Sequence, residues 1–251
     1  MSNVQTNCSL ADARADGRRL AILGFHKIGD AAPGGWETWF YIPEATFIAQ
    51  LSYLRENDWR VLDLAAFLRA LAEPEHLPRR AALLTFDDGY RSVLKVALPC
   101  LRHFEYPAVL FVPTDFIGGH NTFDAGAEPD EAICDWDELR ELQQRGVSIQ
   151  SHGVGHRAFS RLTAAEQAEE LVKSREVLEA RLGNSVAVFS YPYGDGGTDA
   201  VWARAALERA GYRAACLYGG GPNAWPAADP YRLTRLAMGP DTDLGAELEA
   251  G

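Results

Sequence analysis

The sequence predicts an α/β protein that folds as a single (β/α) barrel of about seven to eight parallel strands. Short apolar and β-branched runs recur along the chain, and amphipathic helical patterns separate most of them, which is the order of parallel strands joined by helical crossovers. The length of 251 residues, 47% of them hydrophobic, suffices for one large domain with a buried core. The expected strands lie at 20–25, 59–62, 81–86, 108–112, 147–150, 186–190, 213–217 and 233–238.

The helices between these strands have recognisable starts and stops. Residues 44–57 place four apolar side chains at three- and four-residue steps, and we expect them to pack on the sheet: Phe47, Ile48, Leu51 and Leu54. Capping residues followed by a stopping glycine predict three more helices, from Asp135 to Gly146, from Thr163 to Gly183 and from Asp199 to Gly211. The acidic segment 118–134 is expected to be a long loop of the kind that often forms a lid.

The composition disfavours several classes of protein. With 24 Lys and Arg against 35 Asp and Glu, the net charge is −11, which argues against nucleic acid as a partner because phosphate binding needs a basic surface. No run approaches the roughly 20 apolar residues of a membrane-spanning helix, and the apolar run after Arg18 and Arg19 is too short for an export signal. We therefore expect a cytoplasmic protein without membrane insertion. The four cysteines show neither a CxxC pair nor a zinc-ribbon spacing, which suits a reducing compartment: Cys8, Cys100, Cys134 and Cys216.

Polar side chains follow several of the predicted strands. His26 follows the first strand, Asp87 and Asp88 follow 81–86, and His152 and His156 follow 147–150. Because the active sites of (β/α) barrels lie at the carboxyl ends of the strands, we expect two carboxylates and three imidazoles to converge there.

Both pairs have a simple structural interpretation beside a chemical one. His152 and His156 are four residues apart, so one turn can direct both imidazoles at a divalent ion such as zinc, whereas two surface histidines are the alternative. Asp87 and Asp88 precede Gly89, a combination typical of a turn. Two adjacent carboxylates at a buried strand end also repel each other unless a cation or a proton compensates. One would then bind a metal and the other act as a base.

At these positions the chain resembles the NodB-type polysaccharide deacetylases, carbohydrate esterase family 4. The resemblance rests on Thr85-Phe86-Asp87-Asp88-Gly89, Ser151-His152-Gly153-Val154-Gly155-His156 and Tyr191-Pro192-Tyr193-Gly194, in that order. Leu23-Gly24-Phe25-His26 resembles the circularly permuted branch that includes poly-β-1,6-N-acetylglucosamine deacetylases. The resemblance implies a distorted, circularly permuted barrel at 19–240, after a polar tail at 1–18 and before a short tail at 241–251.

The resemblance also implies a role for five residues of these motifs. Asp88, His152 and His156 would hold a divalent metal ion, with Zn²⁺ expected. Asp87 would be the general base for the attacking water, and the backbone N–H of Tyr193 would stabilise the oxyanion.

The general acid needs a different assignment, because most of the family uses a histidine near the C-terminal end and none follows His156 here. In the permuted branch the strand that bears the acid lies at the N-terminus, which makes His26 the expected proton donor to the departing amine. A histidine satisfied locally at a strand end is the alternative.

Two positions depart from the family pattern. Gly153 stands where Ser or Thr usually follows the first histidine, so a hydrogen bond that stabilises the loop is expected to be lost. Ser190 stands where an arginine usually orients the base, and Arg235 is the candidate replacement.

Several other residues are expected near the mouth of the barrel. By resemblance, Leu162 would line a small pocket for the acetyl group. Six aromatic residues are also expected there: Trp36, Trp39, Phe40, Tyr41, Tyr90 and Trp136. Each ring could stack on a sugar, and the alternative is that it packs its own loop.

The sequence thus favours a metal-dependent hydrolase that removes N-acetyl groups from an amino-sugar poly- or oligosaccharide. Two alternatives stay open. The same site acting on a non-sugar amide is one, and a non-catalytic glycan-binding relative, suggested by the missing arginine, is the other.

Overall fold

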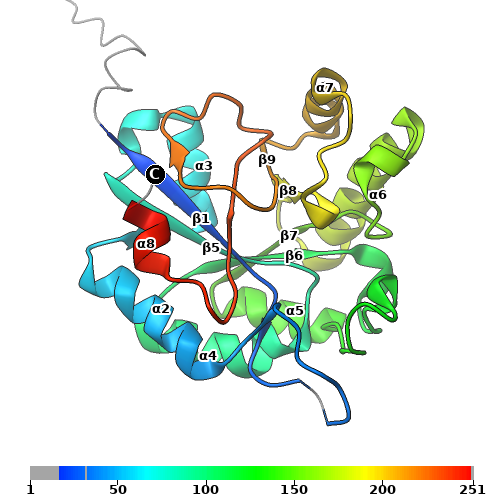
Figure 1. Ribbon diagram of the computed structural model, residues 1–251. Coiled ribbons are helices and arrows are strands. Elements are labelled where there is room, and N and C mark those ends of the chain that lie inside the picture. The colour runs from blue at the N-terminus through cyan, green and yellow to red at the C-terminus, as the bar shows by residue number, and fades with distance from the viewer. Residues whose placement is uncertain (1–16, 32, 250–251) are drawn as a thin grey trace, which may run out of the picture.

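A curved sheet of nine strands, surrounded by helices, forms the centre of the molecule (Figure 1). The computed structural model describes residues 17–31 and 33–249. In pairing order the sheet contains β10 (Asn223–Ala224), β1 (Arg19–Phe25), β5 (Arg80–Phe86), β6 (Ala108–Val112), β7 (Val147–Ser151), β8 (Val188–Ser190) and β9 (Ala214–Cys216). In addition, β4 (Arg60–Val61) pairs with β5, and β11 (Leu236–Ala237) pairs with β1.

The pairs from β1 through β9 are all parallel, and β10 is antiparallel to β1. Strands β1 and β5 pair residue for residue, from Arg19 opposite Arg80 to Phe25 opposite Phe86. Parallel pairing places the carboxyl ends of these strands at one edge of the sheet.

The C-terminal part of the chain links the last long strand to the first. Leu233 forms a parallel bridge with Cys216 of β9, and β11 then pairs in parallel with β1. The first strand therefore lies beside the end of the chain, as a permuted barrel requires. The predicted fold class, a distorted (β/α) barrel, is confirmed.

All eight predicted strands are present, although several are shorter than predicted. The segment 108–112 matches β6, whereas 233–238 contains the two-residue β11. The sequence analysis did not predict the separate two-stranded parallel sheet of β2 (Lys27–Ile28) and β3 (Tyr41–Ile42), which follows His26.

The predicted helices are found with their caps. Capping boxes at Asp135 and Thr163 begin two of them, and Gly183 and Gly211 end two in the left-handed conformation. The helices are α2 (Glu44–Glu56), α3 (Leu64–Ala72), α4 (Leu98–Phe104), α5 (Trp136–Gln144), α6 (Ala164–Leu182), α7 (Ala200–Ala210) and α8 (Leu244–Glu249). Helix α8 lies in the range 241–251, where a tail was expected, and packs against α2 with Leu244 and Leu248 buried.

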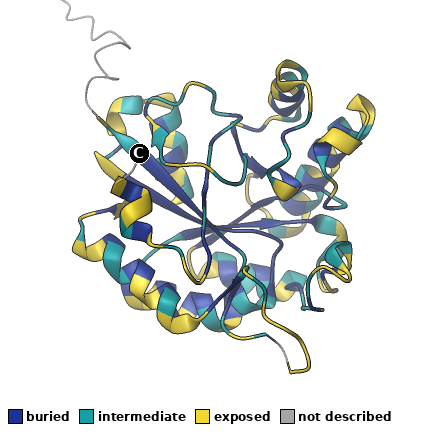
Figure 2. Ribbon diagram, in the orientation of Figure 1, coloured by how far each residue is buried: buried dark blue, intermediate teal, exposed yellow. Residues whose placement is uncertain are grey.

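The strands are buried on both faces of the sheet, while the helices expose their outer faces (Figure 2). Alternate residues of β1 enter different clusters, with Ala21 and Leu23 on the side of most helices. Leu20 and Ile22 pack on the opposite face, together with Phe67 of α3. This double burial explains why the strands read as nearly continuous apolar runs.

Other sequence expectations concern cysteines and membrane helices. Cys100, Cys134 and Cys216 are buried, free thiols, and Cys8 lies outside the described residues, as does most of the predicted N-terminal tail. In the described ranges, no helix combines the length and the hydropathy needed to cross a bilayer.

The predicted apolar face of α2 is wrong at one position. Phe47, Leu51 and Leu54 are fully buried, but Ile48 is 38% exposed. Each residue turns a helix by about 100°, so Ile48 projects well to one side of the stripe formed by the other three. The ring of Phe47 packs against Phe25 and Phe86, with ring centroids 5.2 and 6.0 Å away.

We expect Phe47→Ala to lower the free energy of unfolding by about 3–5 kcal/mol, because a buried ring at the ends of β1 and β5 is lost. Ile48→Ala, the neighbouring control, should change it by less than about 1 kcal/mol. Urea denaturation of both variants checks this. Equal losses in the two variants would contradict the packing described here.

Candidate active site

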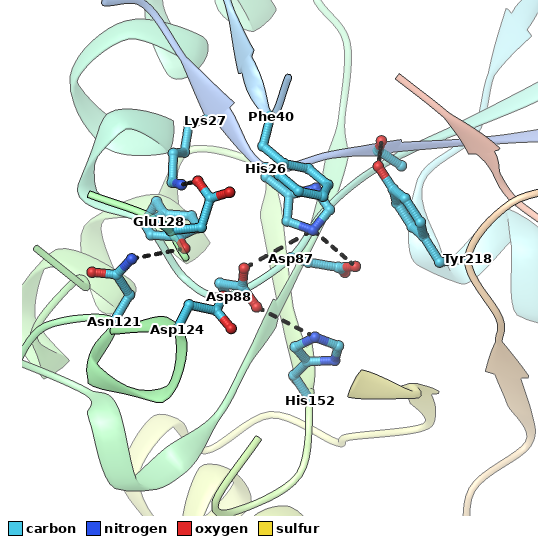
Figure 3. A network of polar contacts seen from close by, with 12 residues as sticks. His26, Lys27, Phe40, Asp87, Asp88, Asn121, Asp124, Glu128, His152 and Tyr218 are labelled. Carbon is cyan, nitrogen blue, oxygen red and sulfur yellow. Dashed lines mark hydrogen bonds and ion pairs between the residues drawn. The ribbon is translucent and has the colours of Figure 1, made fainter. Parts of the chain in front are cut away.

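Residues that follow three parallel strands of the sheet meet at its carboxyl edge (Figure 3). His26 follows β1, Asp87 and Asp88 follow β5, and His152 follows β7. They line a cavity of about 320 Å³, called here the inner cavity. Its other walls include Lys27, Phe40, Tyr90, Asp124, Glu128, His156, Tyr193 and Tyr218.

Asp88, His152 and His156 form a compact group of buried ligand atoms, all within 4.8 Å of one another. The Nε2 atoms of His156 and His152 lie 3.1 and 3.4 Å from the same carboxylate oxygen, Asp88 Oδ1. That oxygen is buried, yet neither contact has the alignment of a hydrogen bond. Three buried ligand atoms this close together fit a divalent cation, and a carboxylate with two imidazoles is a donor set that zinc accepts.

The surrounding groups fix the orientation and the charge of these side chains. His152 Nδ1 lies 2.7 Å from the carbonyl oxygen of Ser190, which turns its Nε2 toward Asp88. Burial by itself raises the pKa of Asp88, but the charge of His156 and the close approach of both imidazoles to the carboxylate outweigh it. The pKa of Asp88 is therefore held well below its usual value, and the carboxylate is available as a ligand.

Arg235 forms a bidentate ion pair with Asp87 in the interior of the protein. Nη1 and Nη2 lie 2.8 and 2.7 Å from the two carboxylate oxygens, and Arg235 is 0% exposed. Burial raises the pKa of Asp87, but the Arg235 charge, followed by that of His152, outweighs burial and holds the pKa below its usual value.

Arg235 also accounts for the departure at Ser190. Its Nη2 donates to Ser190 Oγ at 2.8 Å, and its Nε donates to the carbonyl oxygen of Leu217 at 2.7 Å. The small side chain of Ser190 leaves room for the guanidinium to reach Asp87 from β11's side of the barrel. The cation expected to replace the missing arginine is thus in contact with the carboxylate.

His26 faces both carboxylates from the end of β1. Its Nε2 lies 4.0 Å from Asp87 Oδ2 and 4.0 Å from Asp88 Oδ2, and its side chain is 15% exposed. The ring packs between Phe40 and Tyr218, with centroids 4.7 and 5.2 Å away (Figure 3). Burial lowers the pKa of His26, and the charges of Asp88 and Asp87 offset this only in part.

Three residues of the site adopt a left-handed backbone conformation that residues other than glycine seldom take. The φ angles of Asp88, His156 and Tyr193 are 68°, 50° and 59°. Such conformations cost about 1–3 kcal/mol each, and they persist where the surrounding structure enforces them. Tyr193 lines the inner cavity with its ring beside His156, at a centroid distance of 4.6 Å.

Glu170 of α6 is a residue of the site that the sequence analysis missed. Its carboxylate is buried and accepts hydrogen bonds from the backbone N–H groups of Val154 and Gly155 and from Arg157 Nε. These bonds hold the loop between the two histidines, the role expected of a Ser or Thr at position 153. Gly153 has a φ of 82°, and an added Cβ would lie 2.8 Å from Glu170 Oε2, so a side chain here would strain the backbone and displace the carboxylate. A charged residue beside Leu171 on the buried face of α6 was the available sequence signal.

The long segment 118–134 forms one wall of the inner cavity through Asp124, Ala127 and Glu128. Leu162 lines a second cavity of about 830 Å³, called here the outer cavity, which shares His156 and Tyr193 with the inner one. The role of Leu162 at an acetyl pocket stays a prediction.

The six aromatic residues lie in different surroundings, and the stacking of any of them on a sugar stays a prediction. Phe40 and Tyr90 line the inner cavity, and the ring of Tyr41 packs near Lys27. Trp36 and Trp39 are 52% and 40% exposed, and Trp39 donates to Asp241. Trp136 packs against the guanidinium of Arg181.

A family model described as polysaccharide deacetylase matches residues 75–215, more than half of the chain. The chain belongs to the polysaccharide deacetylase family. The matched range contains Asp87, Asp88, His152, His156 and Tyr193, whereas His26 and Arg235 lie outside it.

Individual proteins that are similar to this polysaccharide deacetylase family member are also named as deacetylases. Over 78% of its length the chain is 24% identical to YxkH of Bacillus subtilis, named after the same family, and covers 63% of that protein. It is 26% identical, over 77% of its length, to the poly-β-1,6-N-acetyl-D-glucosamine N-deacetylase of Escherichia coli, covering 33% of it. The chain thus spans less than two thirds of both relatives. The fold matches the Streptococcus pyogenes deacetylase PplD with a TM-score of 0.74 and 22% identity, covering 89% of this chain and 93% of that one.

We expect Glu170→Gln to lower the free energy of unfolding by about 1–3 kcal/mol, since a buried carboxylate that accepts three hydrogen bonds is neutralised. Amide hydrogen exchange at Val154 and Gly155 should accelerate. The neighbouring variant Glu169→Gln, which affects an exposed pair with Lys173, is the control. Unchanged exchange in Glu170→Gln would show that the loop is held by other contacts.

Proposed function

We propose that this protein is a metal-dependent hydrolase that removes N-acetyl groups from an amino-sugar poly- or oligosaccharide. The observation that carries the proposal is the Asp88, His152 and His156 group beside an arginine-bound Asp87 in one cavity. Membership of the polysaccharide deacetylase family supports it, and similarity to a poly-β-1,6-N-acetyl-D-glucosamine N-deacetylase favours N-acetylglucosamine as the sugar.

Asp88, His152 and His156 would hold the metal ion, and their donor set suits Zn²⁺. A bound divalent ion would supply Lewis acidity, lowering the pKa of a coordinated water and polarising the acetyl carbonyl.

Asp87 serves as the general base that accepts a proton from the attacking water. Each of its oxygens already accepts one hydrogen bond from Arg235, which fixes the plane of the carboxylate and keeps it ionised. A carboxylate has about four acceptor positions, so capacity remains for the water. Arg235 is accordingly a positioning residue.

His26 serves as the general acid for the departing amine. It lines the inner cavity, and its Nε2 lies 4.0 Å from a carboxylate oxygen of Asp87 and 4.0 Å from one of Asp88. The backbone N–H of Tyr193 would stabilise the negative charge that develops on the acetyl oxygen.

The contact of Arg235 with Asp87 counts against a non-catalytic glycan-binding protein, because the base has its cation. Acetate release from N-acetylglucosamine oligomers, compared with release from non-sugar acetamides, separates the proposed substrate class from other amides.

We expect chelation to abolish acetate release and added Zn²⁺ to restore it. Asp88→Ala should lose the metal, because one of three ligands is removed. Asp87→Asn should keep the metal but lower kcat by about 10²–10⁴, because it cannot accept a proton. Metal content by mass spectrometry and acetate assays check both variants. A fully active Asp87→Asn would refute the assignment of the base.

We expect His26→Ala to retain metal and fold while kcat falls by about 10²-fold or more, since the leaving amine loses its proton donor. His103→Ala, an exposed histidine on α4, is the matched control. Near wild-type turnover in His26→Ala would exclude His26 as the acid.

A further inference from the structure

A separate cavity lies at the amino edge of the sheet, and none of the chemistry above uses it. Its volume is about 430 Å³, within the range of ligand pockets in proteins, and it is called here the amino-edge cavity. Arg19, the first residue of β1, lines it, whereas His26 follows the other end of the same strand. A strand rises about 3.3 Å per residue, so this cavity lies roughly 20 Å from the proposed acid.

Two arginines lie side by side in the amino-edge cavity. Strands β1 and β5 pair with Arg19 opposite Arg80, and both residues line the cavity. Opposite residues of paired strands direct their side chains to the same face of a sheet. Two residues further along, Ala21 and Ala82 belong to the core cluster that contains the buried side chains of α2. The two guanidinium groups therefore begin this inward row, and like charges placed opposite each other repel.

The guanidinium of Arg19 lacks an acceptor. Its Nη1 is buried and has no hydrogen-bond partner in the part of the chain that the structure describes. Arg80, by contrast, donates from Nη1 to the carbonyl oxygen of Asn57 at 2.9 Å, and Asn57 also lines the cavity. A buried donor without an acceptor is costly. An anion in the cavity would supply both an acceptor for Arg19 and a charge that offsets the repulsion between the arginines.

The lining of the amino-edge cavity carries an excess of positive charge. Arg79 is a third arginine at its wall, and the one acidic residue among the described residues that line it is the exposed Glu249. The whole chain, in contrast, has a net charge of −11. Positive charge gathered in one cavity of an acidic protein favours an anion there over the rest of the surface.

We propose that the amino-edge cavity binds a dianionic phosphate group between Arg19 and Arg80. A phosphate monoester carries close to two negative charges at neutral pH, which matches two guanidinium groups. The planar N–H donors of arginine also suit phosphate oxygens. Free phosphate and a phosphorylated small molecule share this chemistry. The inference is independent of the proposed function, because neither an acetyl group nor a metal ion takes part.

Calorimetric titration of the full chain with inorganic phosphate at constant ionic strength tests the site. We expect phosphate to bind at least about 10-fold more tightly than nitrate, which has a single charge. Arg19→Gln and Arg80→Gln should each weaken phosphate binding by about 10-fold, because a charge and its hydrogen bonds are lost. The matched control is Arg102→Gln, which removes an exposed arginine of α4 and should stay within about twofold.

Amide chemical shifts in NMR spectra locate the bound phosphate in the unaltered protein. Shifts centred on Arg19, Asn57 and Arg80 would support the inference. Shifts confined to Asp88 and the loop 152–156 would place the phosphate at the proposed metal site and overturn it. Equal affinities of the wild-type protein for phosphate and nitrate, or unchanged phosphate binding in both arginine variants, would also overturn it.

Phenyl phosphate distinguishes the two sources of the ligand. The rings of Tyr53 and Trp59 also line the amino-edge cavity, so they lie where the organic part of a monoester would be. Tighter binding of phenyl phosphate than of inorganic phosphate, reduced by Tyr53→Ala, would support a phosphorylated small molecule as the ligand. Equal binding of the two would support free phosphate.

Discussion

The ion pair between Arg235 and Asp87 connects the closure of the barrel to the chemistry of its mouth. The two residues are 148 positions apart, and both are buried. Removal of one partner from such a pair leaves an uncompensated charge in the interior, which typically costs about 3–5 kcal/mol. Arg235 lies on the segment that connects β9 to β1. If this segment moved away, Asp87 would remain as an uncompensated buried charge. Fold closure and the orientation of Asp87, the proposed base, depend on the same contact.

The remaining polar residues of the site are also held from outside the motifs. Glu170 supports the loop between His152 and His156, and Lys27 supports the wall that carries Asp124. Both supports are buried charges with several partners, the form in which a buried charge is tolerated. Strained backbone at Asp88, His156 and Tyr193 is stable in this setting because the neighbouring contacts enforce it.

Local patterns in the sequence predicted most of the framework. Capping boxes at Asp135 and Thr163 and the apolar strand runs each depend on residues a few positions apart, so they could be identified without a structure. The convergence of His26, Asp88 and His152 followed from parallel strand order. The hydrogen bonds of Glu170 and the ion pair of Lys27 with Glu128 could not be predicted. Their partners lie 13 to 101 positions away in the sequence, and only the packing of the fold brings them together. Arg235 was identified as a candidate partner of Asp87, but the bidentate geometry of the contact was not predicted.

The residue-by-residue pairing of β1 with β5 has a further consequence. Phe25 lies opposite Phe86, and the N–H of Asp87 donates to the carbonyl of Phe25 at 2.9 Å. His26 and Asp87 are thus the next step of one hydrogen-bonded ladder, and the spacing between the proposed acid and base is a property of the backbone. A slip of one residue between these strands would turn one of the two side chains to the other face of the sheet. In this barrel, the strand register is what matches the proton donor to the proton acceptor.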